Sequence, residues 1–350
     1  MKIRVLVIDD SATVRMLLKA GLEADGRILV VGTARDPFEA REKIVELNPD
    51  VLTLDIEMPR MDGLKFLTKL MPQFPLPVIM VSSLTRTGQQ ITMQCLEAGA
   101  LDFVTKPVSA TPDGLNSMLS LLRDKICDAA RVDVSGFRNQ RYIATTSTNR
   151  VQPKRHWAAS TIVVVGASTG GTEALKVFLT KLPQEFPPVL AVQHMPAGYT
   201  THFANRLNEL CAMKVCEATD GMQIEAGCVY IAPGGRQMGL SLADERNRIR
   251  ITEGEKVSGH KPSVDHLFLS LLPLNRRRVV ALIMTGMGAD GAMGMAKLHE
   301  AGAYTMAQDE ASCVVFGMPK AAIMAGGVQV VCPLYQMADT LMDYLSEVDK

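Results

Sequence analysis

The chain has 350 residues, 47% of them hydrophobic, and its 37 basic and 37 acidic side chains give a formal net charge of +0. This size and composition predict two globular domains with sizeable cores. The charge balance argues against a nucleic-acid partner, and no apolar run approaches the ~18–20 residues that insert across a membrane. The seven cysteines include no CxxC pair, which is typical of a reduced, cytoplasmic protein.

Residues 1–125 alternate short apolar runs with segments of helical periodicity. Strands are predicted at 5–8, 29–33, 51–54, 78–81 and 102–104, and helices at 12–22, 37–47, 63–70, 88–97 and 115–127. Regular β-α alternation is typical of a doubly wound parallel sheet. We therefore expect an α/β domain of the flavodoxin-like (βα)5 type.

Charged side chains stand where these predicted strands end. Asp9 and Asp10 follow the first strand, and Asp55 follows the third. Because ligands bind outside the carboxyl ends of parallel strands, the three carboxylates should converge, and they suit Mg²⁺. Ser82 ends the fourth strand and Lys106 follows the fifth. A central carboxylate beside a metal, an ammonium and a hydroxyl indicates a site that accepts a phosphoryl group.

With these residues in place, 1–125 resembles a response-regulator receiver domain. The likeness extends to the motifs DIEMP at 55–59 and MDG at 61–63. It implies that Asp55 is the phosphoacceptor and that Asp9, Asp10, Asp55 and the carbonyl of Glu57 hold Mg²⁺. It also implies that Ser82 and Lys106 contact the phosphoryl group.

Residues 126–158 keep no apolar period, and we interpret them as a flexible linker. A second α/β unit is predicted over 159–350. Its strands are expected near 162–166, 188–193, 228–232 and 279–284, a hairpin at 240–251 and a last helix at 335–348. This pattern predicts a doubly wound, mostly parallel sheet with a β-hairpin insertion.

The second unit opens with a buried strand that runs into a turn of small residues around Ser168. A serine at a strand-to-helix turn is well presented as a nucleophile, and helix N-terminal amides beside it can receive an oxyanion. Such a serine needs a base and a group that orients the base. His194 ends the next predicted strand, and Asp290 lies in the glycine-rich turn after a later one. All three are therefore expected at one edge of the sheet.

Two sequence motifs in this unit match those of other protein classes. The sequence GASTG at 166–170 fits the GxSxG of α/β-hydrolases, but those enzymes order their triad serine, acid, histidine. Gly286, Gly288 and Gly291, with Asp309 beyond them, fit a dinucleotide-binding fingerprint, although the motif comes late in the domain. Among the other histidines, we expect His260 and His266 to line the substrate site and His202 to lie on the surface.

Over 160–350 the sequence resembles the CheB family of chemotaxis protein-glutamate methylesterases. The likeness is carried by GASTGG at 166–171, QHMP at 193–196, HKPSVD at 260–265 and TGMGADG at 285–291. It implies a catalytic triad of Ser168, His194 and Asp290, with the backbone amides of Thr169 and Met287 for the oxyanion, and no cofactor in the catalytic domain.

The same resemblance implies a phosphorylation-activated serine esterase. Its substrates would be γ-glutamyl methyl esters, and selected glutamines, on the cytoplasmic domains of chemoreceptors. A chemotaxis histidine kinase would donate the phosphoryl group, and the unphosphorylated receiver would block the active site. The alternative is a receiver joined to a non-catalytic output module, although the sequence has no helix-turn-helix signature.

Overall fold

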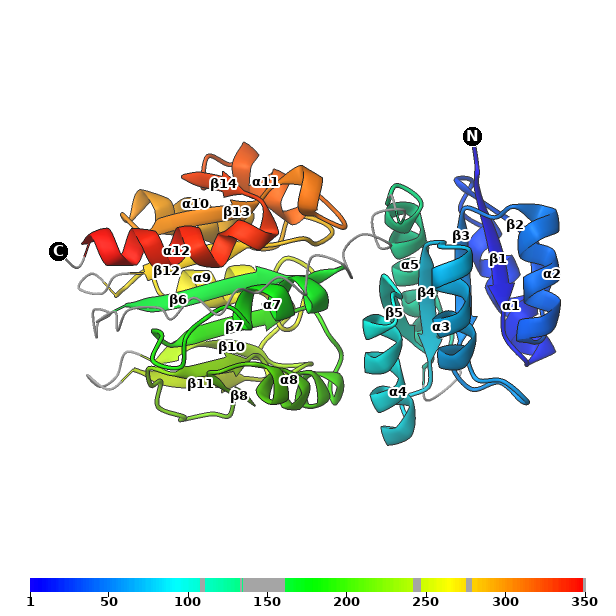
Figure 1. Cartoon of the computed structure of the whole chain (residues 1–350), viewed down its shortest axis with the longest axis horizontal. Helices are drawn as coiled ribbons and strands as arrows, with labels where there is room; N and C mark the ends of the chain where they lie inside the picture. The colour runs from blue at the N-terminus through cyan, green and yellow to red at the C-terminus, as the bar shows by residue number, and fades with distance from the viewer. Residues whose placement is uncertain (108–110, 133, 135–160, 242–246, 275–278, 349–350) are drawn as a thin grey trace. The chain divides into compact units, whose positions relative to one another are not determined.

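The computed structural model describes residues 1–107, 111–132, 134, 161–241, 247–274 and 279–348. The chain forms two compact units, Met1–Arg150 and Val151–Lys350. Figure 1 draws the first in blue to cyan and the second in green to red. Among the described residues, no helix combines the length and the apolar character that crossing a bilayer requires.

In the first unit, five parallel strands of the described chain form one sheet in the order β2-β1-β3-β4-β5. The strands are β1 Ile3–Ile8, β2 Ile28–Ala34, β3 Val51–Asp55, β4 Val78–Ser82 and β5 Asp102–Thr105. The helices are α1 Ala12–Glu23, α2 Pro37–Leu47, α3 Gly63–Gln73, α4 Arg86–Glu97 and α5 Pro112–Ala129. This order confirms the predicted flavodoxin-like fold, whose ligand crevice lies where β1 and β3 meet.

Polar side chains cap the N-termini of helices in this unit. Asp36 accepts hydrogen bonds from the amides of Phe38 and Glu39 at the start of α2, and Asp62 accepts one from Lys65 at the start of α3. Such caps satisfy backbone donors that have no partner inside the helix. At the other end of the unit, α5 includes residues 126–129 of the predicted linker, and 135–160 lies outside the described residues.

In the second unit, seven parallel strands of the described chain follow the order β14-β13-β12-β6-β7-β9-β8. They are β6 Ile162–Ala167, β7 Val189–Gln193, β8 Lys214–Glu217, β9 Cys228–Ile231, β12 Val279–Ile283, β13 Tyr304–Gln308 and β14 Val330–Cys332. The helices are α7 Gly171–Leu179, α8 Tyr199–Leu210, α9 Val264–Ser270, α10 Ala292–Glu300, α11 Met318–Met324 and α12 Leu334–Val348. The predicted parallel sheet and its four predicted strands are confirmed.

The predicted hairpin is also present, as the antiparallel pair β10 Gln237–Ser241 and β11 Arg248–Thr252. It forms a separate two-stranded sheet, and β10 packs against α9. In the main sheet, every residue of β6 is buried. Because β6 lies between β7 and β12, the chain that leaves its carboxyl end is flanked by the ends of both neighbours.

Candidate active site

The acidic cluster of the first unit forms at the carboxyl ends of β1 and β3. Asp9, Asp10 and Asp55 each place a carboxylate oxygen within 4.8 Å of the others. The ammonium of Lys106, just after β5, lies 2.9 Å from Asp9 Oδ2 and 2.9 Å from Asp55 Oδ2. The structure therefore brings together the three predicted carboxylates and the predicted lysine, although they come from distant parts of the sequence.

Burial sets the electrostatics of this cluster. Asp55 is 3% exposed, and burial raises its pKa from 3.8 to about 6, with the Asp9 carboxylate raising it further and Lys106 opposing both. Burial would lower the pKa of Lys106, but the Asp55 and Asp9 carboxylates outweigh it and raise that pKa. An arrangement of crowded carboxylates with one ammonium suits an additional hard cation, which prefers oxygen ligands.

Two of the predicted phosphoryl-site and metal-site residues have other partners. The Ser82 hydroxyl is fully buried and lies 2.7 Å from the hydroxyl of Thr92 on α4. The Glu57 side chain accepts a hydrogen bond from Ser83, and the metal role predicted for this residue uses its backbone carbonyl instead. Arg15, which the sequence analysis missed, donates to the carbonyls of Asp9 and Asp10 at 2.8 and 2.9 Å and fixes the loop that carries them.

In the second unit, Ser168 follows β6 directly and is held from both sides. Its amide donates to the Thr285 carbonyl at 3.0 Å, and its carbonyl accepts from Gln193 Nε2 at 2.8 Å. Thr285 follows β12 and Gln193 ends β7, so the backbone of Ser168 is hydrogen-bonded to the ends of both neighbouring strands. Gly170 is the N-cap residue of α7, and its φ of 75° is a conformation that favours glycine. Ser168 is 8% exposed.

His194 and Asp290 meet at the same sheet edge. His194 Nε2 lies 2.8 Å from Asp290 Oδ2, and the His194 amide donates to the carbonyl of Ala167, the residue before Ser168. The other ring nitrogen, His194 Nδ1, is buried and has no hydrogen-bond partner among the described residues. One imidazole nitrogen thus contacts a carboxylate, and the other is available to accept a proton.

The Asp290 carboxylate also accepts hydrogen bonds from the first turn of α9. Its Oδ1 accepts from the Ser263 hydroxyl at 2.8 Å and the Asp265 amide at 2.9 Å, and its Oδ2 accepts from the Val264 amide at 2.7 Å. Burial would raise the pKa of Asp290, but the hydrogen bonds from His194 and these amides outweigh it and hold that pKa below its usual range. Asp290 is therefore an ionised, fixed acceptor for the histidine.

The two residues whose amides are predicted for the oxyanion, Thr169 and Met287, lie in segments close to Ser168. Thr169 is the next residue, and its carbonyl accepts from the Thr285 hydroxyl at 3.0 Å. Met287 follows Gly286, where a side-chain Cβ would lie only 2.8 Å from Ser168 Cβ. The Met287 N–H donates to none of the described residues. Both chain segments therefore pass beside the serine.

Two of the three glycines in the dinucleotide-like motif are required by the packing of the protein itself. A Cβ at Gly286 would contact Met318 and Ser168, and one at Gly291 would lie 2.6 Å from Val264 Cγ1. Asp309, the candidate ribose acid, instead accepts a hydrogen bond from the Ser312 amide. Close contacts within the protein thus explain Gly286 and Gly291, and a φ of 81° explains Gly288, rather than room for a pyrophosphate.

The remaining predicted histidines differ in their surroundings. The ring of His260 stacks on that of His194, with centroids 3.8 Å apart and planes 5° from parallel. His266 is half-buried on α9, where burial lowers its pKa. His202 lies half-exposed on α8. His260 therefore belongs to the immediate surroundings of the candidate triad.

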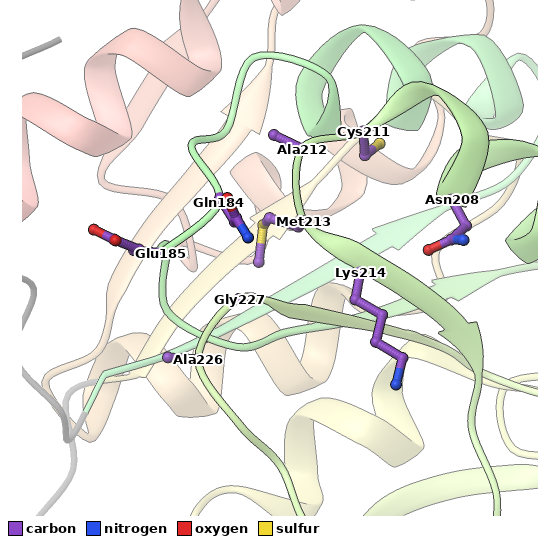
Figure 2. A pocket seen from close by; sticks show the side chains of 9 residues that line it. All are labelled: Gln184, Glu185, Asn208, Cys211, Ala212, Met213, Lys214, Ala226 and Gly227. Carbon is purple, nitrogen blue, oxygen red and sulfur yellow. The ribbon is translucent and has the colours of Figure 1, made fainter.

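A groove of about 510 Å³ lies elsewhere on this unit (Figure 2). It is lined by Lys214 at the start of β8, by Gly227 just before β9 and by the turn around Cys211. These positions are at the amino ends of the strands, whereas Ser168 and His194 follow carboxyl ends. The groove is therefore distinct from the candidate active site.

Comparison with known proteins agrees with both units. The response regulator receiver domain family matches residues 5–119, and the CheB methylesterase family matches residues 163–341. A protein-glutamate methylesterase/protein-glutamine glutaminase of Syntrophotalea carbinolica is 51% identical over 99% of this chain and 98% of its own length. One from Pectobacterium atrosepticum is 47% identical over 99% and 97%.

The chain belongs to the CheB methylesterase family. A solved structure, the Thermotoga maritima CheB methylesterase catalytic domain, aligns with a TM-score of 0.51 at 38% identity, covering 52% of this chain and 97% of that domain. This CheB-family chain is thus a protein-glutamate methylesterase/protein-glutamine glutaminase with a receiver domain. The alternative of a non-catalytic output module is set aside.

Several residues that hold the site of this CheB-family chain were not predicted from the sequence. Gln193 anchors the Ser168 carbonyl, and the Ser263 hydroxyl and the amides of Val264 and Asp265 hold Asp290. Gln193 and Ser263 lie inside motifs that carried the family resemblance. Their presence there was the available signal, but the pattern alone does not say which partner each residue contacts.

Proposed function

We propose that Ser168, His194 and Asp290 form the catalytic triad of this esterase. The observation that carries this proposal is the 2.8 Å contact between His194 and the buried Asp290 carboxylate, beside a serine fixed at the end of the adjacent strand. Asp290 orients the imidazole and stabilises its charged form. In the usual triad Nδ1 faces the acid; here Nε2 does, which leaves Nδ1 as the base toward Ser168.

The reaction then follows acyl-transfer chemistry. Ser168 Oγ attacks the carbonyl carbon of a γ-glutamyl methyl ester while its proton passes to His194 Nδ1. The amides of Thr169 and Met287 stabilise the oxyanion. The bond to the methoxy oxygen breaks, and His194 returns the proton to it, releasing methanol.

The acyl-enzyme is cleared by the reverse use of the same groups. Water gives a proton to His194 and attacks the acyl carbon, the bond to Ser168 Oγ breaks, and the proton returns to the serine. The product is a glutamate side chain. A receptor glutamine follows the same path and releases ammonia, because its leaving group also needs only a proton from His194.

In the receiver, we propose that Asp55 accepts a phosphoryl group from a chemotaxis histidine kinase. Asp9, Asp10, Asp55 and the carbonyl of Glu57 would hold Mg²⁺, and the clustered carboxylate oxygens suit that ion. When bound, Mg²⁺ offsets negative charge on the phosphoryl oxygens. Lys106 offsets more of that charge, and Ser82 is the hydroxyl that turns from Thr92 toward the phosphoryl group.

The regulation follows as a shift in equilibrium. The unphosphorylated receiver blocks the Ser168 site, and phosphorylation favours the open arrangement, so that basal activity remains without phosphodonor. The substrates are glutamyl esters and glutamines on chemoreceptor cytoplasmic domains, which places the enzyme in the cytoplasm. We expect neither nucleic-acid binding nor insertion into a membrane.

Methanol release from methylated receptor membranes tests this proposal. Ser168→Ala should abolish release, and a small phosphodonor with Mg²⁺ should increase release by the unsubstituted protein. Hydrolysis that survives Ser168→Ala contradicts the triad. Hydrolysis that does not respond to phosphodonor contradicts the control by the receiver but not the triad.

A further inference from the structure

The imidazole of His194 has a second neighbour besides Asp290. The His260 ring covers one of its faces, 3.8 Å away and within 5° of parallel. The His194 side chain is only 8% exposed. This face-to-face contact is close enough to restrict how the His194 ring can turn.

His260 is presented by a tight turn. The amide of Val257 donates to the His260 carbonyl at 3.1 Å, and the amide of His260 donates to the Val257 carbonyl at 2.9 Å. The two residues between them, Ser258 and Gly259, have φ of 51° and 82°. Two consecutive residues with positive φ are typical of a two-residue hairpin turn, which is a rigid connection.

Buried polar groups anchor this turn to the rest of the unit. The Ser258 hydroxyl donates to Asp265 Oδ2 at 2.7 Å, and Asp265 Oδ1 accepts from the Gly294 amide at 2.7 Å. The His260 carbonyl accepts from Gln237 Nε2 at 3.0 Å. Asp265 and Gln237 are 2% and 1% exposed. The position of His260 is thus determined by hydrogen bonds to buried residues of β10 and α9.

One hydrogen bond alone leaves the orientation of an imidazole underdetermined. The bond from His194 Nε2 to Asp290 fixes one edge of the ring, and the ring plane can still rotate about that contact. His194 Nδ1 has no hydrogen-bond partner among the described residues, so no second bond holds the plane. A flat side chain stacked on the face supplies the missing restraint.

We propose that His260 is a positioning residue that fixes the plane of the His194 ring, so that Nδ1 stays aimed at Ser168 Oγ. The Ser258–Asp265 hydrogen bond holds the turn that makes the stack possible. This proposal rests on the proposed triad. It differs from the expectation that His260 lines the substrate site, because a positioning residue acts on kcat and a substrate contact acts on KM.

If His260 acts by stacking, a flat side chain at position 260 should be sufficient, whether or not it is an imidazole. In the full-length protein, His260→Leu should lower kcat of ester hydrolysis about 10- to 100-fold with KM nearly unchanged, since small misplacements of a catalytic group cost this much. His260→Phe keeps a flat face and should restore most of the loss. His202 lies half-exposed on α8, so His202→Leu is the matched control and should leave kcat unchanged. Thermal unfolding checks that each variant is folded.

Ser258→Ala provides a second test that leaves both rings intact. It should lower kcat in the same direction as His260→Leu, by a smaller factor, because the turn loses its anchor on Asp265. If His260→Phe is as impaired as His260→Leu, or if KM rises while kcat is kept, His260 does not position His194. His194→Ala, assayed in parallel, separates the two proposals: full activity there overturns the triad, whereas an inactive His194→Ala beside a fully active His260→Leu overturns the positioning role alone.

Discussion

Replacement of Asp55 by asparagine is expected to stabilise the receiver unit at neutral pH when no divalent cation is present. The side chain is 3% exposed and lies beside Asp9, and burial raises its pKa from 3.8 to about 6. The ionised form is therefore less favourable in the folded unit than in the unfolded chain. Asparagine has the same shape and carries no charge, so the variant avoids this cost.

The magnitude follows from the difference between the two pKa values. The folded unit binds the Asp55 proton more tightly, so its stability is greatest below pH 3.8 and falls as the pH rises through about 6. At ~1.4 kcal/mol per pKa unit, the full loss is about 3 kcal/mol. The advantage of Asp55→Asn should therefore grow from about 1 kcal/mol at pH 4.5 to about 3 kcal/mol at pH 8.

Hydrogen exchange of the β1 and β3 amides, measured by mass spectrometry on the full chain in EDTA, reports the unfolding free energy of this unit. Asp36→Asn is the matched control. The Asp36 carboxylate is also buried, but the hydrogen bond from the Glu39 amide, helped by Arg60, holds its pKa below 3.8 despite burial. That variant should be less stable than the unsubstituted protein, by a constant amount between pH 5 and 8.

If the unfolding free energy of Asp55→Asn does not rise above that of the unsubstituted protein with pH, burial does not control the pKa of Asp55. Addition of Mg²⁺ should reduce the difference, because the cation stabilises the unsubstituted unit by about 1.4 kcal/mol at ten times its dissociation constant. The variant, with one carboxylate fewer, should gain less.

The remaining predictions concern both sites. Asp290→Asn should lower kcat of ester hydrolysis about 10³- to 10⁴-fold, because an amide NH₂ would face groups that themselves donate to the carboxylate. Gly286→Ala should lower kcat at least about tenfold by displacing Ser168, whose Cβ would lie 2.8 Å from the new methyl group. Gly254→Ala is its control, since the nearest atom there is 3.5 Å away, and equal activities would contradict the packing explanation. Lys106→Met should reduce phosphorylation by a small phosphodonor, measured as mass gain, because Asp55 loses the cation that favours its ionised form.

The strands of the first unit were predictable because they are short apolar runs, and all of them except β2 lead into a polar residue at the ligand edge. In the second unit the same reasoning found β6, β7, β9 and β12, which are interior strands with mostly apolar sequences. It missed β8 and β14 because edge strands are short and partly exposed. It missed β13 because Thr305 and Gln308 interrupt the apolar run, although both are buried.

The candidate site was predictable only to the level of its strand ends. Positions after β6, β7 and β12 brought Ser168, His194 and Asp290 to one edge, since parallel strands end together. The cap that Asp290 gives to α9 and the stack of His260 on His194 depend on how a turn and a helix pack across the sheet edge. No spacing in the sequence encodes those contacts, because they join segments whose separation is set by tertiary structure.

Methanol release from methylated receptor membranes, with and without a small phosphodonor and Mg²⁺, is the most direct test of an esterase controlled through its receiver. We predict that phosphodonor increases release by the unsubstituted protein, fails to increase release by Asp55→Asn, and that Ser168→Ala releases none under either condition. Equal stimulation of Asp55→Asn, or release by Ser168→Ala, would contradict this account.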